Sequence, residues 1–255
     1  MSPNTIKDQK PLIPIMAHLV LGYPSLAESI RTAEQYIASG VAILELQIPF
    51  SHPTADGPVI TLACQKATQE GVTVSACLEA IQALRTKFPK QEIMAMSYLN
   101  RIYHYGFQAF MDQLKALGIK NLIVPDLPAD AIRDFAVQHN SVHFVPVLAA
   151  NTTDARLDQL LALDFDFYYL MSDFKITGSG FSLHPRLKEI IQKIRAKAVH
   201  RPRIGIGFGI STPEQARIIV AEADVAIIGS VLIQAQNAGK LEEYLESLQQ
   251  EFNTP

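Results

Sequence analysis

The sequence is poor in charge, and this shortage excludes two kinds of protein. Charged residues make up 18% of its 255 residues, against about a quarter in an average soluble domain, while apolar residues make up 48%. A chain this apolar can bury a large core, which excludes a disordered protein. Its 22 basic and 25 acidic residues leave a net charge of −3. We therefore expect neither nucleic acid nor a membrane surface as a partner.

Cysteine is scarce, tryptophan is absent, and long apolar runs are missing. The two cysteines, Cys64 and Cys77, form neither a disulfide framework nor a zinc-binding spacing, so we expect two free thiols and no metal. The opening residues 1–10 lack the apolar core of a signal peptide. No stretch reaches the roughly 18 apolar residues of a membrane span. These features predict a cytoplasmic protein.

Short β-rich runs alternate with helical patterns along the whole chain, without a linker. Apolar residues three and four apart predict helices between the runs. Hydroxyl residues such as Ser25, Thr153 and Thr212 stand where helices begin, and Gly40 and Gly118 stand where helices end. The predicted strands are Ile13–Val20, Ala42–Ile48, Glu92–Tyr98, Asn121–Val124, His143–Leu148, Phe165–Met171, Arg203–Gly207 and Asp224–Ile228. Eight strands, each followed by helix, predict a single (β/α)8 barrel domain over residues 1–255, with a doubly wound open sheet as the alternative.

The second predicted strand carries a carboxylate among apolar residues. Alternation places Leu44, Leu46 and Ile48 on the face that meets the helices. Glu45 then points into the barrel, where an isolated charge is costly unless it is paired or neutralised. Such a group suits proton transfer near neutral pH. The alternative is a structural carboxylate bonded to a neighbouring tyrosine or serine.

Two further segments lie at the carboxyl ends of strands, where barrel enzymes place their active sites. The loop after the second strand carries Asp56, which is either a second acid/base group or a simple Asp-Gly turn. Glycines follow the seventh and eighth strands at 205–209 and 229. They bring bare backbone N–H groups to a helix N-terminus and are typical of a phosphate site, although glycines also serve simply as turn formers.

Several motifs together resemble the tryptophan synthase alpha chain family. They are Leu44-Glu45-Leu46 with Pro49-Phe50-Ser51, Ala55-Asp56-Gly57-Pro58, Leu21-Gly22-Tyr23-Pro24, Tyr98-Leu99-Asn100, Pro125-Asp126-Leu127-Pro128, Ile176-Thr177-Gly178 and Gly207-Phe208-Gly209-Ile210-Ser211. They occur in family order, and the resemblance covers the chain from about Ile13 to Phe252. It implies a lyase of tryptophan biosynthesis that cleaves indole-3-glycerol phosphate to indole and glyceraldehyde 3-phosphate by a retro-aldol reaction, without a metal or organic cofactor.

The resemblance also implies a role for individual residues. Glu45 is the implied general acid/base, which protonates indole C3 and takes the glycerol hydroxyl proton, and Asp56 accepts the indole N–H. The implied substrate-binding residues are Tyr98, Leu99, Tyr169 and Phe208 around indole, and Thr177, Gly178, Gly207, Gly209, Gly229 and Ser230 toward phosphate. The implied partner is a pyridoxal-phosphate-dependent β subunit in an αββα complex, which receives indole through a tunnel.

The chain departs from the family pattern at three places. Gln47 stands where the family usually has glycine, about 6–7 Å above Glu45 on the same face, so it either crowds the ligand or hydrogen-bonds the catalytic carboxyl group. His52 replaces an aspartate of the following loop. The segment 172–178 carries Asp173 and Lys175 where the family has a small or basic stretch. These departures favour one alternative, an alpha-like subunit with little or no catalysis that binds and regulates a β chain. A further alternative is another barrel aldolase or isomerase that acts on a different sugar phosphate.

Overall fold

Nine parallel strands form one curved sheet at the centre of the protein. The computed structural model describes residues 12–128, 131–132, 142–163, 165–172, 183–207 and 209–253. The strands are β1 (Ile13–Val20), β2 (Val41–Gln47), β3 (Glu92–Met96), β4 (Asn121–Ile123), β5 (His143–Val145), β6 (Val147–Ala149), β7 (Phe167–Met171), β8 (Arg203–Gly207) and β9 (Val225–Ile228). Their order in the sheet is β5-β4-β3-β2-β1-β9-β8-β7-β6.

The ring closes at Pro146, which joins β5 to β6. β5 pairs with β4 and β6 pairs with β7, so the two short strands are halves of the strand predicted at 143–148. Proline has no N–H to donate to a ladder, which divides that strand. Its carbonyl accepts a hydrogen bond from the N–H of Tyr169 at 3.0 Å. Counted in this way the sheet has eight strands. The expected (β/α)8 barrel is confirmed, and the open sheet is wrong.

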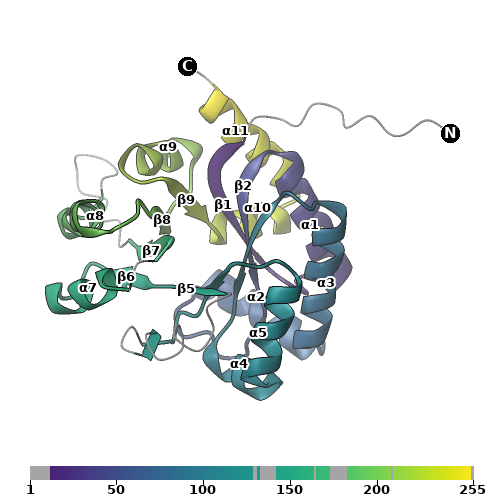
Figure 1. Cartoon of the computed structure of the whole chain (residues 1–255). Helices are drawn as coiled ribbons and strands as arrows, with labels where there is room; N and C mark the ends of the chain where they lie inside the picture. The colour runs from purple at the N-terminus through teal and green to yellow at the C-terminus, as the bar shows by residue number, and fades with distance from the viewer. Residues whose placement is uncertain are drawn as a thin grey trace.

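Helices surround the sheet, and most of them lie where the apolar pattern predicts. In the described residues they are α1 (Leu26–Ala38), α2 (Pro58–Gln69), α3 (Val74–Lys87), α4 (Leu99–Tyr105), α5 (Phe107–Ala116), α7 (Asp154–Leu161), α8 (Pro185–Lys197), α9 (Pro213–Glu222), α10 (Ser230–Asn237) and α11 (Leu241–Asn253). Figure 1 shows α1, α3 and α5 along one side of the barrel and α7, α8 and α9 along the other. Across these described ranges, no helix has both the length and the apolarity to cross a bilayer.

The predicted helix ends are confirmed where hydrogen bonds and backbone angles define them. The side chains of Ser25, Thr153 and Thr212 accept hydrogen bonds from backbone N–H groups in the first turns of α1, α7 and α9. Gly40 and Gly118 have φ values of 82° and 66°. This left-handed conformation favours glycine, because a side chain there meets its own backbone.

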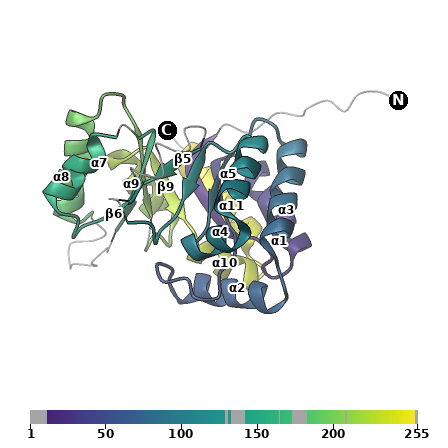
Figure 2. The same ribbon diagram turned by 60° about the horizontal axis from the view of Figure 1, so that its bottom comes forward.

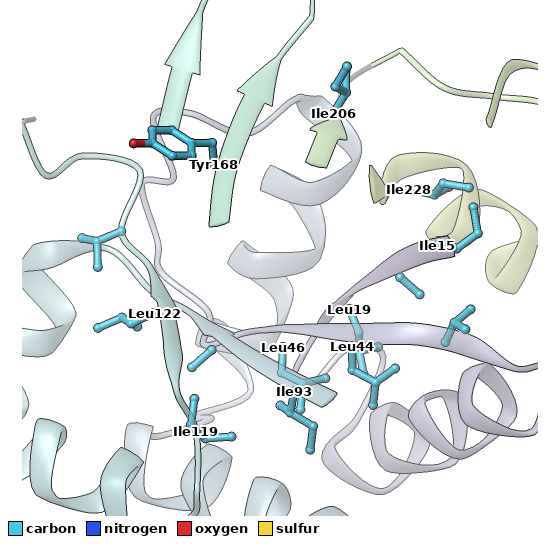
Figure 3. Packing of buried hydrophobic residues seen from close by; sticks show 14 of the residues in the cluster. Ile15, Leu19, Leu44, Leu46, Ile93, Ile119, Leu122, Tyr168, Ile206 and Ile228 are labelled. Carbon is cyan, nitrogen blue, oxygen red and sulfur yellow. The ribbon is translucent and has the colours of Figure 1, made fainter. Parts of the chain in front are cut away.

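Alternate residues of each strand enter two separate apolar layers. Figure 3 shows the outer layer between strands and helices, with Leu19, Leu44, Leu46 and Ile93 gathered against the neighbouring helices. The inner layer fills the barrel with side chains of the opposite strand face, among them Ile43. The period of two in a strand produces this separation, and it fixes which side chains face the centre.

Two short helices, α4 and α10, lie at the carboxyl ends of the strands; α4 was not expected from the sequence, whereas a helix N-terminus was expected beside Gly229. Figure 2 shows α10 beside α2 at this end of the barrel. Ile233 of α10 packs with Ile60 and Cys64 of α2 and with Val20 at the end of β1. This small apolar cluster holds α10 over the opening of the barrel, where its N-terminus faces the site described next.

Candidate active site

Glu45 points into the barrel from β2, as alternation predicts. Its neighbours Leu44 and Leu46 belong to the outer apolar layer, whereas Ile43 belongs to the inner one. Only 2% of the Glu45 surface is exposed to solvent. A carboxylate buried to this degree needs a partner, because desolvation of an isolated charge is costly.

The partner of Glu45 is His18, which sequence reasoning missed. His18 stands directly opposite Glu45 in the pairing of β1 with β2, and its Nδ1 lies 3.4 Å from Glu45 Oε1. It is 4% exposed. The sequence did contain one signal for His18 as a site residue. It is the only titratable residue in the apolar run Ile13–Val20, and it shares the inward face with Met16. That face of β1 is therefore polar at the level of the carboxylate.

Asp56 lies on the loop between β2 and α2 and is held by two donors. Its Oδ2 accepts a hydrogen bond from Gln47 Nε2 at 2.7 Å and another from the Tyr98 hydroxyl at 2.9 Å. The Tyr98 hydroxyl in turn accepts one from the N–H of Ala55 at 3.1 Å. Gln47 is fully buried. The expected contact of Gln47 with a carboxyl group is thus present, but the group is Asp56 and not Glu45.

The buried charges act on one another. Burial raises the pKa of Asp56, although His18, Gln47 and Tyr98 oppose the rise by favouring its charged form. Burial alone lowers the pKa of His18, but the charge and hydrogen bond of Glu45, with help from Asp56 and Gln47, outweigh it and raise that pKa. One imidazole therefore lies within the electrostatic influence of two carboxylates, which favour its protonated form.

A cavity of about 250 Å³ is lined by these groups and by residues of β3, β4 and β7. Glu45, Asp56 and His18 line it on one side. Its remaining wall includes the apolar side chains of Met96 and Ile123. A cavity with an apolar wall and two carboxylates suits a flat aromatic ligand that exchanges a proton.

Another part of the cavity's lining comes from the segments after β8 and β9. Gly209 and Ser211 after β8 line it, together with Gly229 and Ser230 at the start of α10. Gly209 has a φ of 74°. Gly229 is the N-cap of α10 and provides no side-chain cap, so the first N–H groups of this helix are open to an anion. A helix N-terminus of this kind favours negative charge.

The remaining predicted residues are only partly gathered at this cavity. Tyr169 lines it, and Gly207 lies against Tyr169, since a Cβ on Gly207 would stand 2.6 Å from the Tyr169 hydroxyl oxygen. Tyr98 is not among the described residues that line the cavity, and it reaches the site through its hydrogen bond to Asp56. Among the described residues Leu99 does not line the cavity. It is the first residue of α4 and packs against the outer layer, because the strand has already ended at Met96.

Three predicted ligand-binding residues, Thr177, Gly178 and Phe208, lie outside the described residues, as does the segment with Asp173 and Lys175. His52 is exposed on its loop, where its Nδ1 and the hydroxyl of Ser51 are 2.8 Å apart. Within the ranges that the structure describes, no group of three or more His, Cys, Asp or Glu side chains is arranged to hold a metal ion.

Comparison with known proteins gives one consistent result. A family model described as "Tryptophan synthase alpha chain" matches residues 4–254. The tryptophan synthase alpha chain of Dehalococcoides mccartyi is 36% identical over 222 residues, which is 86% of each chain. That of Syntrophotalea carbinolica is 32% identical over 256 residues, covering 97% of this chain and all of the relative.

Solved structures agree with these relatives. The aminoacrylate-bound tryptophan synthase of M. tuberculosis contains a chain that superposes with a TM-score of 0.81 at 26% identity, covering 96% of this chain and 94% of that one. The tryptophan synthase alpha chain of Legionella pneumophila gives a TM-score of 0.79 at 25% identity, covering 96% and 92%.

Proposed function

The chain belongs to the tryptophan synthase alpha chain family, and from this premise we propose that it cleaves indole-3-glycerol phosphate to indole and glyceraldehyde 3-phosphate. The observation that carries the proposal is that buried Glu45 and half-buried Asp56 line one cavity whose lining also includes the N-terminus of α10. A substrate that carries both an aromatic ring and a phosphate matches this combination of apolar wall, carboxylates and helix N-terminus.

In this proposal the phosphate binds at the start of α10. The open N–H groups there and the hydroxyl of Ser230 donate hydrogen bonds to it, and the helix dipole adds to the attraction. The indole ring then extends along the apolar wall toward Asp56. Its N–H donates to the Asp56 carboxylate, which has two lone pairs per oxygen and is already oriented by Gln47 and Tyr98.

Glu45 carries the proton traffic of the cleavage. Protonated Glu45 delivers its proton to indole C3, which makes that carbon tetrahedral and moves positive charge onto the ring nitrogen, where Asp56 stabilises it electrostatically. Glu45 then accepts the proton of the glycerol hydroxyl while the carbon–carbon bond breaks. The bonding electrons return to the indole ring, and the hydroxyl carbon becomes the aldehyde of glyceraldehyde 3-phosphate. The proton given to indole C3 is replaced by the proton taken from the glycerol hydroxyl, so the reaction needs no cofactor.

The family also supports a partner. We propose that the chain works with a tryptophan synthase β subunit, which receives the indole. Gln47 favours a second candidate function, because its amide already occupies Asp56 Oδ2 at 2.7 Å. If this contact persists when substrate binds, the chain is a weakly catalytic subunit whose main role is to activate its β partner.

Indole release measured with and without a β subunit distinguishes the two functions. Glu45→Gln should lower kcat at least about a hundredfold, as expected for loss of a positioned acid/base. Glu79→Gln, an exposed carboxylate change on α3, is the matched control and should leave kcat unaltered. If Glu45→Gln releases indole as fast as the unaltered chain, the assignment of Glu45 as the acid/base is refuted. No release from the unaltered chain, even with a β subunit that it activates, establishes the second function instead.

A further inference from the structure

His18 and Glu45 form a buried pair with unused hydrogen-bonding capacity. Their closest atoms, Nδ1 and Oε1, are 3.4 Å apart, somewhat longer than the 2.7–2.9 Å typical of a charge-assisted hydrogen bond. The other two polar atoms, His18 Nε2 and Glu45 Oε2, have no hydrogen-bond partner within the described part of the chain. Buried polar atoms are rarely left without a partner, so Nε2 and Oε2 are available to a group that enters the cavity.

The surroundings of His18 determine which charge the imidazole favours. The acidic groups that face it are Glu45 on β2 and Asp56 on the following loop. On the other side, β9 and α10 contain no ionisable residue, and the backbone of Gly229 packs against the ring. Lys66, the only charged residue of α2, lies over the ring of Tyr23 instead. Among these neighbours the imidazole is therefore the one group that can carry positive charge, and it faces two carboxyl groups.

We propose that His18 is a positioning residue that shares a proton with Glu45 and fixes the direction of its carboxylate, so that the pair sets the pH dependence of the reaction. This inference rests on the proposed function, because it assigns the proton traffic to Glu45. Two carboxylates in one cavity repel each other, and the imidazolium offsets one of them. Glu45 is then held as the base that accepts the hydroxyl proton, with Oε2 left open for that contact.

The rise in the pKa of His18, caused by the two carboxylates against the opposing effect of burial, agrees with a shared proton. Interacting groups of this kind titrate as a pair, with apparent values that belong to neither residue alone. Removing one member must therefore change the titration of the other, and this change is measurable in the free protein.

The first test is the NMR titration of the histidine rings, with His18 assigned by its loss in His18→Asn. In the unaltered protein its ring should keep its proton to higher pH than in Glu45→Gln, because that variant removes the charge that stabilises the imidazolium. His104, exposed on α4, provides the internal reference signal. An identical His18 titration in the two proteins overturns the inference, whatever the reaction is.

The second test is the pH profile of kcat/KM for indole release. Asparagine places an amide nitrogen near the position of Nδ1 but does not titrate in this range. His18→Asn should lose about tenfold or less at the optimum and lose one limb of the profile, whereas His18→Leu should lose about a hundredfold. An unchanged profile in an active His18→Asn protein overturns the inference. Absence of indole release from the unaltered protein would instead count against the proposed function. The titration would still show whether His18 and Glu45 share a proton.

Discussion

Removing the hydroxyl group of Tyr98 is expected to destabilise the protein and to slow its reaction. Tyr98 is fully buried, and its hydroxyl ties the β2–α2 loop to the segment after β3 by donating to Asp56 Oδ2 and accepting from the N–H of Ala55. The change Tyr98→Phe deletes this one oxygen and keeps the ring. Its effect therefore isolates the two hydrogen bonds from the packing of the side chain.

The expected cost follows from those two bonds. A hydrogen bond to a charged group contributes about 1.5–3 kcal/mol, and a buried donor left without a partner costs about 1–3 kcal/mol. Ala55 is partly exposed, so water can reach its N–H and the second cost falls at the low end. The free energy of unfolding should decrease by about 2–4 kcal/mol, which corresponds to a melting temperature lower by roughly 5–10 °C in a protein of this size.

Tyr36 offers a matched control. It is also fully buried, but no hydrogen-bond partner of its hydroxyl is found in the part of the chain that the structure describes. Tyr36→Phe should leave stability unchanged or raise it slightly, since it removes a buried polar atom that gains nothing. Urea unfolding and thermal melting of both variants give the comparison. If Tyr98→Phe is no less stable than Tyr36→Phe, the assignment of energy to the Asp56 and Ala55 contacts is refuted.

The same variant has a kinetic signature. Asp56 retains Gln47 as a donor but loses Tyr98, which opposes the rise in its pKa. The pKa of Asp56 should therefore rise further in Tyr98→Phe, and the acidic limb of the pH profile should move to higher pH. We expect kcat/KM for indole release to fall about tenfold, equivalent to about 1.4 kcal/mol, whereas Tyr36→Phe should not alter it.

Three other predictions concern groups outside this loop. Burial raises the pKa of the Cys64 and Cys77 thiols to about 12 each, so the folded protein should react with an aromatic disulfide reagent at pH 8 far more slowly than the unfolded chain. Arg203→Met should lower the free energy of unfolding by about 1 kcal/mol or less, because its paired bonds to Glu92 join β8 to β3 but are partly exposed. Since the raised pKa of His18 makes the folded state bind more protons, its stabilisation is complete below about pH 6.5 and is lost as pH rises through the folded-state pKa.

Each of these predictions has a direct check. Two thiols that react at the same rate in folded and unfolded protein contradict the burial argument. Lys197→Met breaks an ion pair with Asp158 in which both side chains are about half exposed, and it should cost less than Arg203→Met in urea unfolding. His18→Asn should show a smaller decline of stability above pH 6.5 than the unaltered protein, and an equal decline would contradict the assignment to His18.

Periodicity in the sequence predicted much of the fold correctly. Strand boundaries at Ile13–Val20 and Arg203–Gly207 are confirmed, because strong alternation or a β-rich run between turn residues leaves little choice. The division of the fifth strand at Pro146 was missed, although proline is a known interruption of a ladder. A helix N-terminus was expected beside Gly229, but the extent of α10 was not predicted. Its eight residues are too few for a clear apolar period, and packing against α2 stabilises it instead.

The inward direction of Glu45 was available from alternation alone, since only one arrangement of β2 keeps Leu44, Leu46 and Ile48 against the helices. The neighbours of that carboxylate could not be predicted from alternation. His18 is opposite Glu45 because β1 and β2 pair in one particular register, and Tyr98 reaches Asp56 across 42 residues of chain.

The sequence by itself determined the barrel, the inward carboxylate and the glycine-rich end, because each depends on local periodicity or on backbone freedom. Only the tertiary structure decided which groups meet in the centre: His18 with Glu45, and Gln47 and Tyr98 with Asp56. Strand register and ring closure bring these side chains together, and both arise from contacts between residues far apart in the chain. The electrostatic balance of the site is a property of those contacts, so no single segment contains it.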